Sequence, residues 1–211
     1  MFIDVYGDTL CAMVSSAALA STGHQVTLHV SADAVANGVD NDEFTLREPG
    51  LAALMAEQKA AGRLELSELD AAPGAGCTVL WLALSPGGLE RAHQLLGDLP
   101  LDIDPQFLVV NQSTFPVGST EALQATLHQR PGARAEQGAV VSIPDLLTEG
   151  AALQGFTRGE HWLVGADLPW AMSLVAEILR PFNRRRMRSW RCVRVRRSSP
   201  SWRSTACWRR G

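Results

Sequence analysis

The sequence predicts an α/β fold of the Rossmann-like, doubly wound type, with a mainly parallel sheet and helices on both of its faces. Three observations favour this class. Short apolar runs alternate along the chain with longer stretches of helix formers, as in repeated βαβ units. Residues 78–84 are apolar almost throughout, which is typical of a central parallel strand. Residues 107–110 lead through polar residues into a helical stretch, an arrangement at which open α/β sheets bind ligands.

The first 30 residues have the pattern of one βαβ unit. Residues 2–6 predict a strand, and Gly7 begins a turn. Residues 10–19 are rich in small helix formers and predict a helix that ends at Gly23. Residues 26–30 alternate between apolar and polar side chains, which predicts a second strand. Strand, glycine turn, helix and strand in this order make a βαβ unit.

The later elements follow the same alternation. Pro49 suits the start of a helix, and residues 51–59 continue with good helix formers. Residues 63–66 start a third strand. Further strands are expected at 78–84, 107–110, 139–142 and 161–165, and helices at 89–99 and 169–179. Another helix follows residue 118, with a hydroxyl cap at Ser119 or Thr120.

Length and composition describe an ordinary globular protein. The chain has 211 residues, of which 46% are apolar, and this is enough to bury a core. Neither an apolar run of membrane-spanning length nor a signal-like opening is present, so we expect a cytoplasmic protein without membrane partners. The four cysteines follow no metal-ligand or disulfide spacing, so we expect intracellular thiols and no metal site.

Charge divides the chain at one point. Residues 1–183 carry eight Lys and Arg against all 22 Asp and Glu, whereas residues 184–211 carry eleven Arg and no acid. Such a shift marks a boundary. We therefore expect a Rossmann-like domain at 1–183 and a disordered, Arg- and Trp-rich tail at 184–211. The acidic main body argues against nucleic acid as a partner.

Five segments, in order along the chain, resemble the UDP-glucose/GDP-mannose (nucleotide-sugar) dehydrogenase family, and most resemble its UDP-glucose branch. They are the glycine turn at 7–12, the segment EPGL at 48–51, Ser85-Pro86, the stretch QSTFPVGST at 112–120 and the stretch IPDLLTEG at 143–150. The likeness runs from residue 2 to about residue 182. It implies an NAD-dependent enzyme that oxidises the sixth carbon of a nucleotide-linked hexose such as UDP-glucose, from alcohol to aldehyde to acid.

The resemblance also implies roles for particular residues. In cofactor binding these are Gly7, Asp8, Thr9, Leu10, Cys11, Val30, Ser85, Thr114 and Glu149. Thr114 and Glu149 would position water and cofactor, and Asp145 would assist thioester hydrolysis or contact the substrate. Each of the three catalytic candidates also has a plain structural interpretation: Thr114 as a loop cap, Asp145 as a turn acid and Glu149 as a solvent-exposed side chain.

Several positions depart from the family pattern. Thr9 and Ala12 replace the second and third glycines, and Gln112 replaces a lysine. The middle glycine ordinarily lets the backbone approach the pyrophosphate, so a side chain at Thr9 is expected to weaken NAD binding. Val30 stands where an acid would accept hydrogen bonds from the ribose. The next acid, Asp33, could replace it only if the loop bends back.

Part of the family's machinery has no counterpart in this chain. The catalytic cysteine belongs to a C-terminal domain, and the helix with the catalytic lysine and asparagine is missing, so we expect a truncated chain that is inactive alone. The alternative is a non-catalytic Rossmann-like module for binding or assembly. Family dimers form through a region beyond residue 182, so we also expect an exposed apolar face near residues 169–179 and consider a homo-oligomer.

The tail has two interpretations. It is either a basic, aromatic arm for phosphates and stacked bases or the product of a shifted reading frame, and we favour the second. If the reading frame is shifted by one nucleotide, the codons of residues 201–205 become compatible with Lys-Leu-Ala-Ile-Asn. This resembles the family's Glu-x-x-Lys-Leu-x-x-Asn helix.

Overall fold

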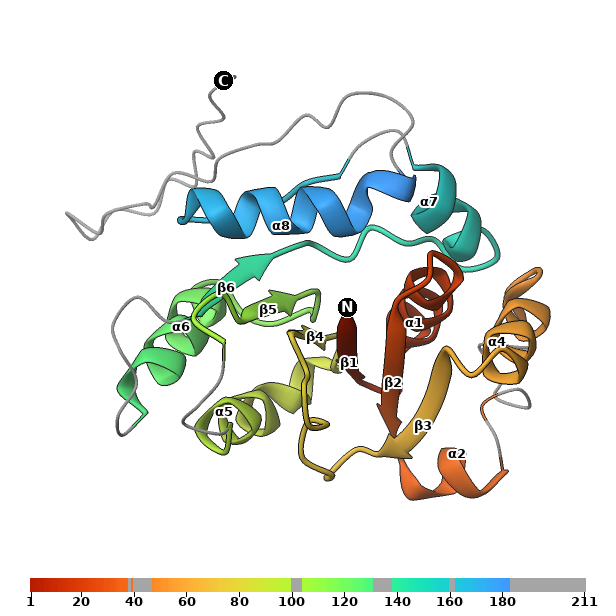
Figure 1. Ribbon diagram of the computed structural model, residues 1–211, viewed down its shortest axis with the longest axis horizontal. Helices are drawn as coiled ribbons and strands as arrows, with labels where there is room; N and C mark the ends of the chain where they lie inside the picture. The colour runs from red at the N-terminus through yellow and green to blue at the C-terminus, as the bar shows by residue number, and fades with distance from the viewer. Residues whose placement is uncertain (38, 40–46, 100–103, 131–137, 160–161, 183–211) are drawn as a thin grey trace.

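The structure, a computed structural model, describes residues 1–37, 39, 47–99, 104–130, 138–159 and 162–182. The predicted tail at 184–211 lies outside them. In chain order, the elements (Figure 1) are β1 (Phe2–Tyr6), α1 (Leu10–Ser21), β2 (Gln25–Val30), α2 (Ala32–Asn37), α4 (Leu51–Ala60), β3 (Leu64–Glu68), β4 (Val79–Leu82), η2 (Pro86–Gly88), α5 (Leu89–Gly97), β5 (Leu108–Asn111), α6 (Ser119–Gln129), β6 (Ala139–Ser142), α7 (Ala152–Arg158), α8 (Pro169–Leu179) and η3 (Arg180–Phe182).

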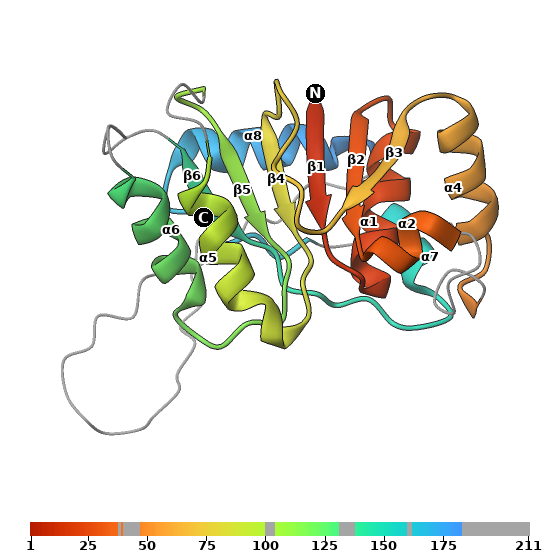
Figure 2. The same ribbon diagram turned by 90° about the horizontal axis from the view of Figure 1, so that it is seen from below.

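The strands of the described residues form one parallel sheet in the order β3-β2-β1-β4-β5-β6 (Figure 2). β4 follows β3 in the chain but lies beside β1, so the direction of strand addition reverses between β1 and β4. In open α/β sheets this switch point is where ligands bind, outside the carboxyl ends of the strands. The predicted fold class is confirmed.

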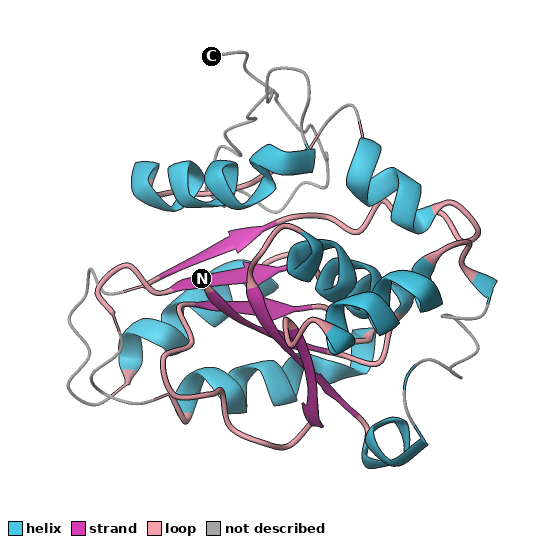
Figure 3. Cartoon of the chain, turned by 45° about the vertical axis from the view of Figure 1, so that its right-hand side comes forward, coloured by secondary structure: helices cyan, strands magenta, loops and turns pink. Residues whose placement is uncertain are grey.

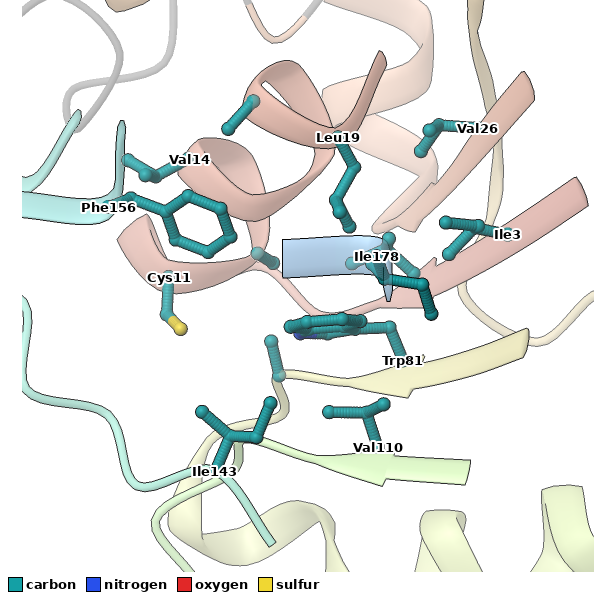
Figure 4. Packing of buried hydrophobic residues seen from close by; sticks show 14 of the residues in the cluster. Ile3, Cys11, Val14, Leu19, Val26, Trp81, Val110, Ile143, Phe156 and Ile178 are labelled. Carbon is teal, nitrogen blue, oxygen red and sulfur yellow. The ribbon is translucent and has the colours of Figure 1, made fainter. Parts of the chain in front are cut away.

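The helices form layers on the two faces of the sheet (Figures 1 and 3). α1, α4, α7 and α8 contribute to the larger of two buried apolar clusters, and α5 and α6 contribute to the other. Trp81 of β4 lies in the middle of the larger cluster, with Val110 of β5 and Ile178 of α8 around it (Figure 4). Burial on both faces explains why the central strands are almost continuously apolar.

Several predicted elements have the observed bounds. The strands at Phe2–Tyr6 and Ala139–Ser142 and the helix at Pro169–Leu179 begin and end where the sequence predicts. The helices at 10–19, 51–59 and 89–99 are confirmed with shifts of one or two residues at their ends. Apolar periodicity was a sufficient signal for these elements, because each one buries a continuous stripe or run.

Other local predictions are wrong. The cap of α6 is not a hydroxyl: Gly118 holds the N-cap position in a left-handed conformation, with no side-chain hydrogen bond to the helix. Ser119 Oγ instead donates to Pro116 O. Residues 162–165 form no regular strand and make only an isolated antiparallel bridge from Gly165 to Ser142, while residue 161 lies outside the described residues.

The sequence pattern also missed two short helices, α2 and α7, whose six and seven residues are too few for a clear apolar period. The apolar face expected near α8 is partly covered in the described residues, where Leu168, Trp170, Met172 and Leu174 have intermediate exposure. Val175, Ile178 and Leu179 are buried, and Trp170 and Met172 pack against the core while partly covered. Within the described ranges, no helix has the length and apolar content needed to cross a bilayer.

A buried polar cluster attaches the connection between β3 and β4 to the sheet. Asp4 Oδ2 accepts from Gly74 N at 2.8 Å, and Asp4 Oδ1 lies 3.6 Å from His29 Nε2. The ring of Tyr6 stacks on His29, with 3.9 Å between ring centroids. Burial alone would raise the pKa of the Asp4 carboxyl, but the interactions with His29 and Cys77 and the hydrogen bond from Gly74 N lower it below its usual value. The cluster therefore holds Asp4 ionised and directs the chain into β4.

Candidate functional site

The turn after β1 packs directly on the end of β4. Gly7 has a φ of 148°, and a Cβ added to it would lie 2.1 Å from Ala83 O. Ala83 N in turn donates to Tyr6 O at 2.9 Å. A side chain at Gly7 is excluded by both the backbone conformation and the space. The packing of the turn against Ala83 therefore requires glycine at this first position of the predicted motif, independently of any ligand.

Thr9 crosses the switch point with its side chain. Its Oγ1 donates to Ala83 O at 2.8 Å and accepts from Ala12 N at 3.2 Å. The second bond makes Thr9 the N-cap of α1, a position that threonine favours. The residue that departs from the family pattern thus both starts the helix and ties the β1–α1 turn to the end of β4.

The loops after β4 and β5 are joined to each other. Leu84 N donates to Ser113 Oγ at 2.9 Å. The next residue along each loop is exposed, and these are Ser85 and Thr114. Within the described residues, neither of these two side chains makes a hydrogen bond. Two predicted site residues therefore present unpaired hydroxyls from adjacent loops at the carboxyl edge of the sheet.

The segment after β6 meets the start of α1. Asp145, on the segment, lies close enough to Cys11 for its charge and a hydrogen bond to affect the thiol. Cys11 is buried near Ile143 (Figure 4). Burial raises the pKa of the Cys11 thiol well above its usual range, and Asp145 raises it further. Burial also raises the pKa of Cys77. Both thiols are therefore held protonated near neutral pH, which makes them poor nucleophiles.

Glu149 lies on the same segment, which a buried carboxylate anchors. Glu48 is only 4% exposed. Its Oε2 accepts from Gly150 N at 2.9 Å, and its Oε1 accepts from Leu153 N at 3.0 Å. It thereby satisfies backbone groups at the start of α7. Glu149 itself is exposed, and within the described residues its carboxylate has no hydrogen-bond partner.

The sequence did not reveal the contacts by which Glu48 anchors the segment that carries Glu149. The sequence predicted a helix start at Pro49 and a family resemblance at residues 48–51, but no contact for Glu48. The hydrogen-bond partners of the carboxylate lie 102 and 105 residues away. No local pattern can signal such a contact; an acid directly before Pro49-Gly50, within a motif of the family, was the available hint.

Replacing Glu48 by alanine is expected to lower the free energy of unfolding by about 2 kcal/mol, because two backbone N–H groups lose a charged acceptor. The melting temperature should fall by roughly 4–8 °C in a domain of this size. Thermal unfolding followed by circular dichroism measures the change. Glu57→Ala, at an exposed position of α4, is the matched control, and equal melting temperatures for the two variants would contradict the anchoring role.

Gln112, at the position of the family's lysine, lies in the core below this edge. It is 2% exposed, and its Oε1 accepts from Ser15 Oγ at 2.8 Å and from Trp81 Nε1 at 2.6 Å. The neutral amide thus links α1, β4 and β5. Because a lysine ammonium cannot accept these two hydrogen bonds, the glutamine is matched to its surroundings in this chain.

Val30 and Asp8 lie at the other side of the switch point. Val30 ends β2 with its side chain fully buried in the core. Asp8 is exposed, and its Oδ1 accepts from Ser31 N at 2.8 Å. Leu10 is the first residue of α1 and is partly covered. The sequence-predicted residues therefore lie at or after the carboxyl ends of strands, although only some of their side chains are exposed.

Comparison with known proteins decides the lineage. The sequence model described as the NAD binding domain of the UDP-glucose/GDP-mannose dehydrogenase family matches residues 1–183. The chain belongs to this family. The predicted resemblance is confirmed.

Relatives within the UDP-glucose/GDP-mannose dehydrogenase family support the assignment. UDP-glucose 6-dehydrogenases from Rhizobium meliloti and Pseudomonas aeruginosa are 26% and 27% identical to this chain over 192 and 194 residues. These alignments cover 86% and 87% of this chain and 43% of each relative. The chain therefore spans less than half the length of the curated relatives that it matches.

Solved structures show the same fold. A UDP-glucose dehydrogenase from Pyrobaculum islandicum superposes with a TM-score of 0.74 at 21% identity, over 86% of this chain and 44% of that one. A UDP-D-ManNAc dehydrogenase from Pyrococcus horikoshii gives 0.71 at 20% identity, over 90% and 46%.

The family's NAD-binding domain implies NAD, and the residues of this edge fit it in part. Gly7 allows the close turn, and Ser85, Thr114 and Glu149 present polar groups without partners among the described residues. Thr9 fills the place of the glycine along which the pyrophosphate passes. Among the described residues, no group of three or more His, Cys, Asp or Glu is arranged to bind a metal ion.

Proposed function

We propose that this chain is the cofactor-binding part of an NAD-dependent nucleotide-sugar dehydrogenase, which oxidises the C6 alcohol of a UDP-glucose-like substrate to a carboxylate. The observation that carries the proposal is the match of residues 1–183 to the family's NAD binding domain. The shared edge of Gly7, Ser85, Thr114 and Glu149, each after the carboxyl end of a parallel strand, supports it.

The chemistry needs two oxidations. In each, a carbon-bound hydrogen leaves as hydride, which NAD accepts when bound, and a proton leaves from oxygen. The exposed Thr114 hydroxyl and Glu149 carboxylate would hold the water that takes this proton and orient the cofactor. Asp145, beside Cys11 at the start of α1, would contact the substrate or assist hydrolysis of a thioester. A thiolate for that thioester has to come from outside the described residues, because Cys11 and Cys77 are protonated near neutral pH.

Two residues are proposed to weaken NAD binding. The Thr9 hydroxyl occupies the space between the β1–α1 turn and Ala83, so a pyrophosphate has to displace it or shift outward. Val30 offers the ribose no acceptor, and its side chain is buried in the core. Distortion at the turn reduces affinity by about tenfold. The missing acid at Val30 has a similar effect where no other carboxylate accepts from the ribose.

Isothermal titration calorimetry of the purified chain with NAD tests the proposal. We expect measurable but weak binding, at cofactor concentrations up to millimolar, and no reduction of NAD when UDP-glucose is added to this chain alone. The absence of any heat at millimolar NAD would contradict the proposed cofactor function. It would favour the second candidate, a non-catalytic binding or assembly module, for which the Thr9–Ala83 hydrogen bond across the switch point is the supporting observation.

A further inference from the structure

The end of β2 lacks the acceptor that a dinucleotide needs there. In Rossmann-type sites an acid at this point accepts hydrogen bonds from the ribose hydroxyls of the adenosine half. Here the residue is Val30, whose side chain is fully buried in the core. The register pairs Tyr6 with His29, so the turn that begins at Gly7 lies directly beside Val30 and Ser31. A group carried by this turn can therefore reach the place of the missing acid.

Asp8 is such a group. Its Oδ1 accepts from Ser31 N, the first residue after β2, at 2.8 Å. This contact places a carboxylate on the β1–α1 turn against the end of the neighbouring strand, at the exposed carboxyl edge of the sheet. Among the described residues, Asp8 Oδ2 has no hydrogen-bond partner. A carboxylate has about four acceptor sites, so Asp8 retains capacity for two hydroxyl donors.

We propose that Asp8 replaces the absent acid at Val30 and accepts hydrogen bonds from the adenosine ribose hydroxyls of NAD. This inference rests on the proposed NAD function. Asp8 would position the adenosine half of NAD over the ends of β1 and β2, and it would determine which cofactor binds. A ribose 2′-phosphate would meet the Asp8 carboxylate, whereas sites for NADP place an arginine there. Asp8 therefore selects NAD over NADP.

Two other roles for Asp8 make different predictions. If the carboxylate serves only to fasten the turn to Ser31, an amide oxygen at the same place serves equally well, and cofactor binding does not depend on its charge. If the carboxylate repels the pyrophosphate, removal of its charge tightens NAD binding. Replacing Asp8 by asparagine keeps the shape and one acceptor oxygen. NAD binding should then weaken under the proposed role, stay unchanged if Asp8 only fastens the turn, and tighten if Asp8 repels the pyrophosphate.

The test measures affinities for NAD and NADP by calorimetry in the whole chain and in Asp8→Asn. We expect NAD affinity to fall about tenfold, the size of one lost hydrogen bond to a charged group, and NADP affinity to rise or stay level. Asp33→Asn and Glu68→Gln are the matched controls. Asp33 is the next acid after Val30 in the sequence, and Glu68 pairs with Val30 on β3. Both should bind NAD within about twofold of the natural chain, well below one hydrogen bond.

Unchanged or tighter NAD binding by Asp8→Asn, with native thermal unfolding, overturns the inference while the NAD function stands. If the natural chain binds no NAD, the comparison is repeated in the Thr9→Gly background. If Asp8→Asn lowers the NAD affinity of the Thr9→Gly chain, the role of Asp8 is supported. In that case only the proposed function is contradicted, because the natural chain itself binds no NAD. A Thr9→Gly chain that also binds no NAD overturns both.

Discussion

Replacing Thr9 by glycine should tighten NAD binding by about tenfold, which corresponds to roughly 1.4 kcal/mol. In the natural chain the Thr9 hydroxyl is engaged with Ala83 O and Ala12 N. A pyrophosphate that approaches the start of α1 has to break the bond to Ala83 or bind farther out, and either costs about one net hydrogen bond. Glycine removes the side chain and leaves the first-turn amides of the helix accessible to phosphate.

Calorimetric titration with NAD measures this change, and Thr9→Ser is the matched control. Serine keeps the hydroxyl and both hydrogen bonds, so its affinity should stay within about twofold of the natural chain. The glycine variant loses little helix stability, because glycine at an N-cap costs only a few tenths of a kcal/mol. Equal affinities for the glycine variant and the natural chain would show that Thr9 does not obstruct the cofactor.

The fold was predictable because its signals are local. The strands of the sheet are short apolar or alternating segments, and the long helices consist of good helix formers with recognisable ends. The bounds of β1, β6 and α8 follow from these patterns alone. The order of the strands was accessible through the opening βαβ unit and the resemblance to a family, since periodicity by itself does not determine which strands are neighbours.

The site was predictable only in outline. Motif positions indicated which loops form it, and these loops do lie on one edge of the sheet. The contacts that shape it join residues far apart in sequence, such as Glu48 with Gly150 and Thr9 with Ala83. Gln112 likewise has partners 97 and 31 residues away. A substitution such as lysine to glutamine can be seen in the sequence, but its meaning depends on those distant partners.

Gly7→Ala is expected to be the most destabilising single substitution that we predict, at about 3–5 kcal/mol. Two effects combine at this position. A φ of 148° is unfavourable for a residue with a side chain, and the new Cβ would lie 2.1 Å from Ala83 O, a backbone atom that cannot rotate away. Relief requires β1 and β4 to separate at the switch point, and this breaks the hydrogen bond from Ala83 N to Tyr6 O.

Gly62→Ala separates these two effects. Gly62 also has a positive φ, of 66°, but an added Cβ there would meet no atom within 4 Å. Its cost should therefore be that of the backbone conformation alone, about 1–2 kcal/mol. Urea unfolding of both variants measures the difference. A cost at Gly7 no larger than that at Gly62 would mean that the β1–α1 turn yields easily, and a turn that yields could also move Thr9 out of the path of a dinucleotide. The stability of Gly7→Ala thus reports how rigidly the switch point is held, which is the physical basis for expecting Thr9 to obstruct NAD.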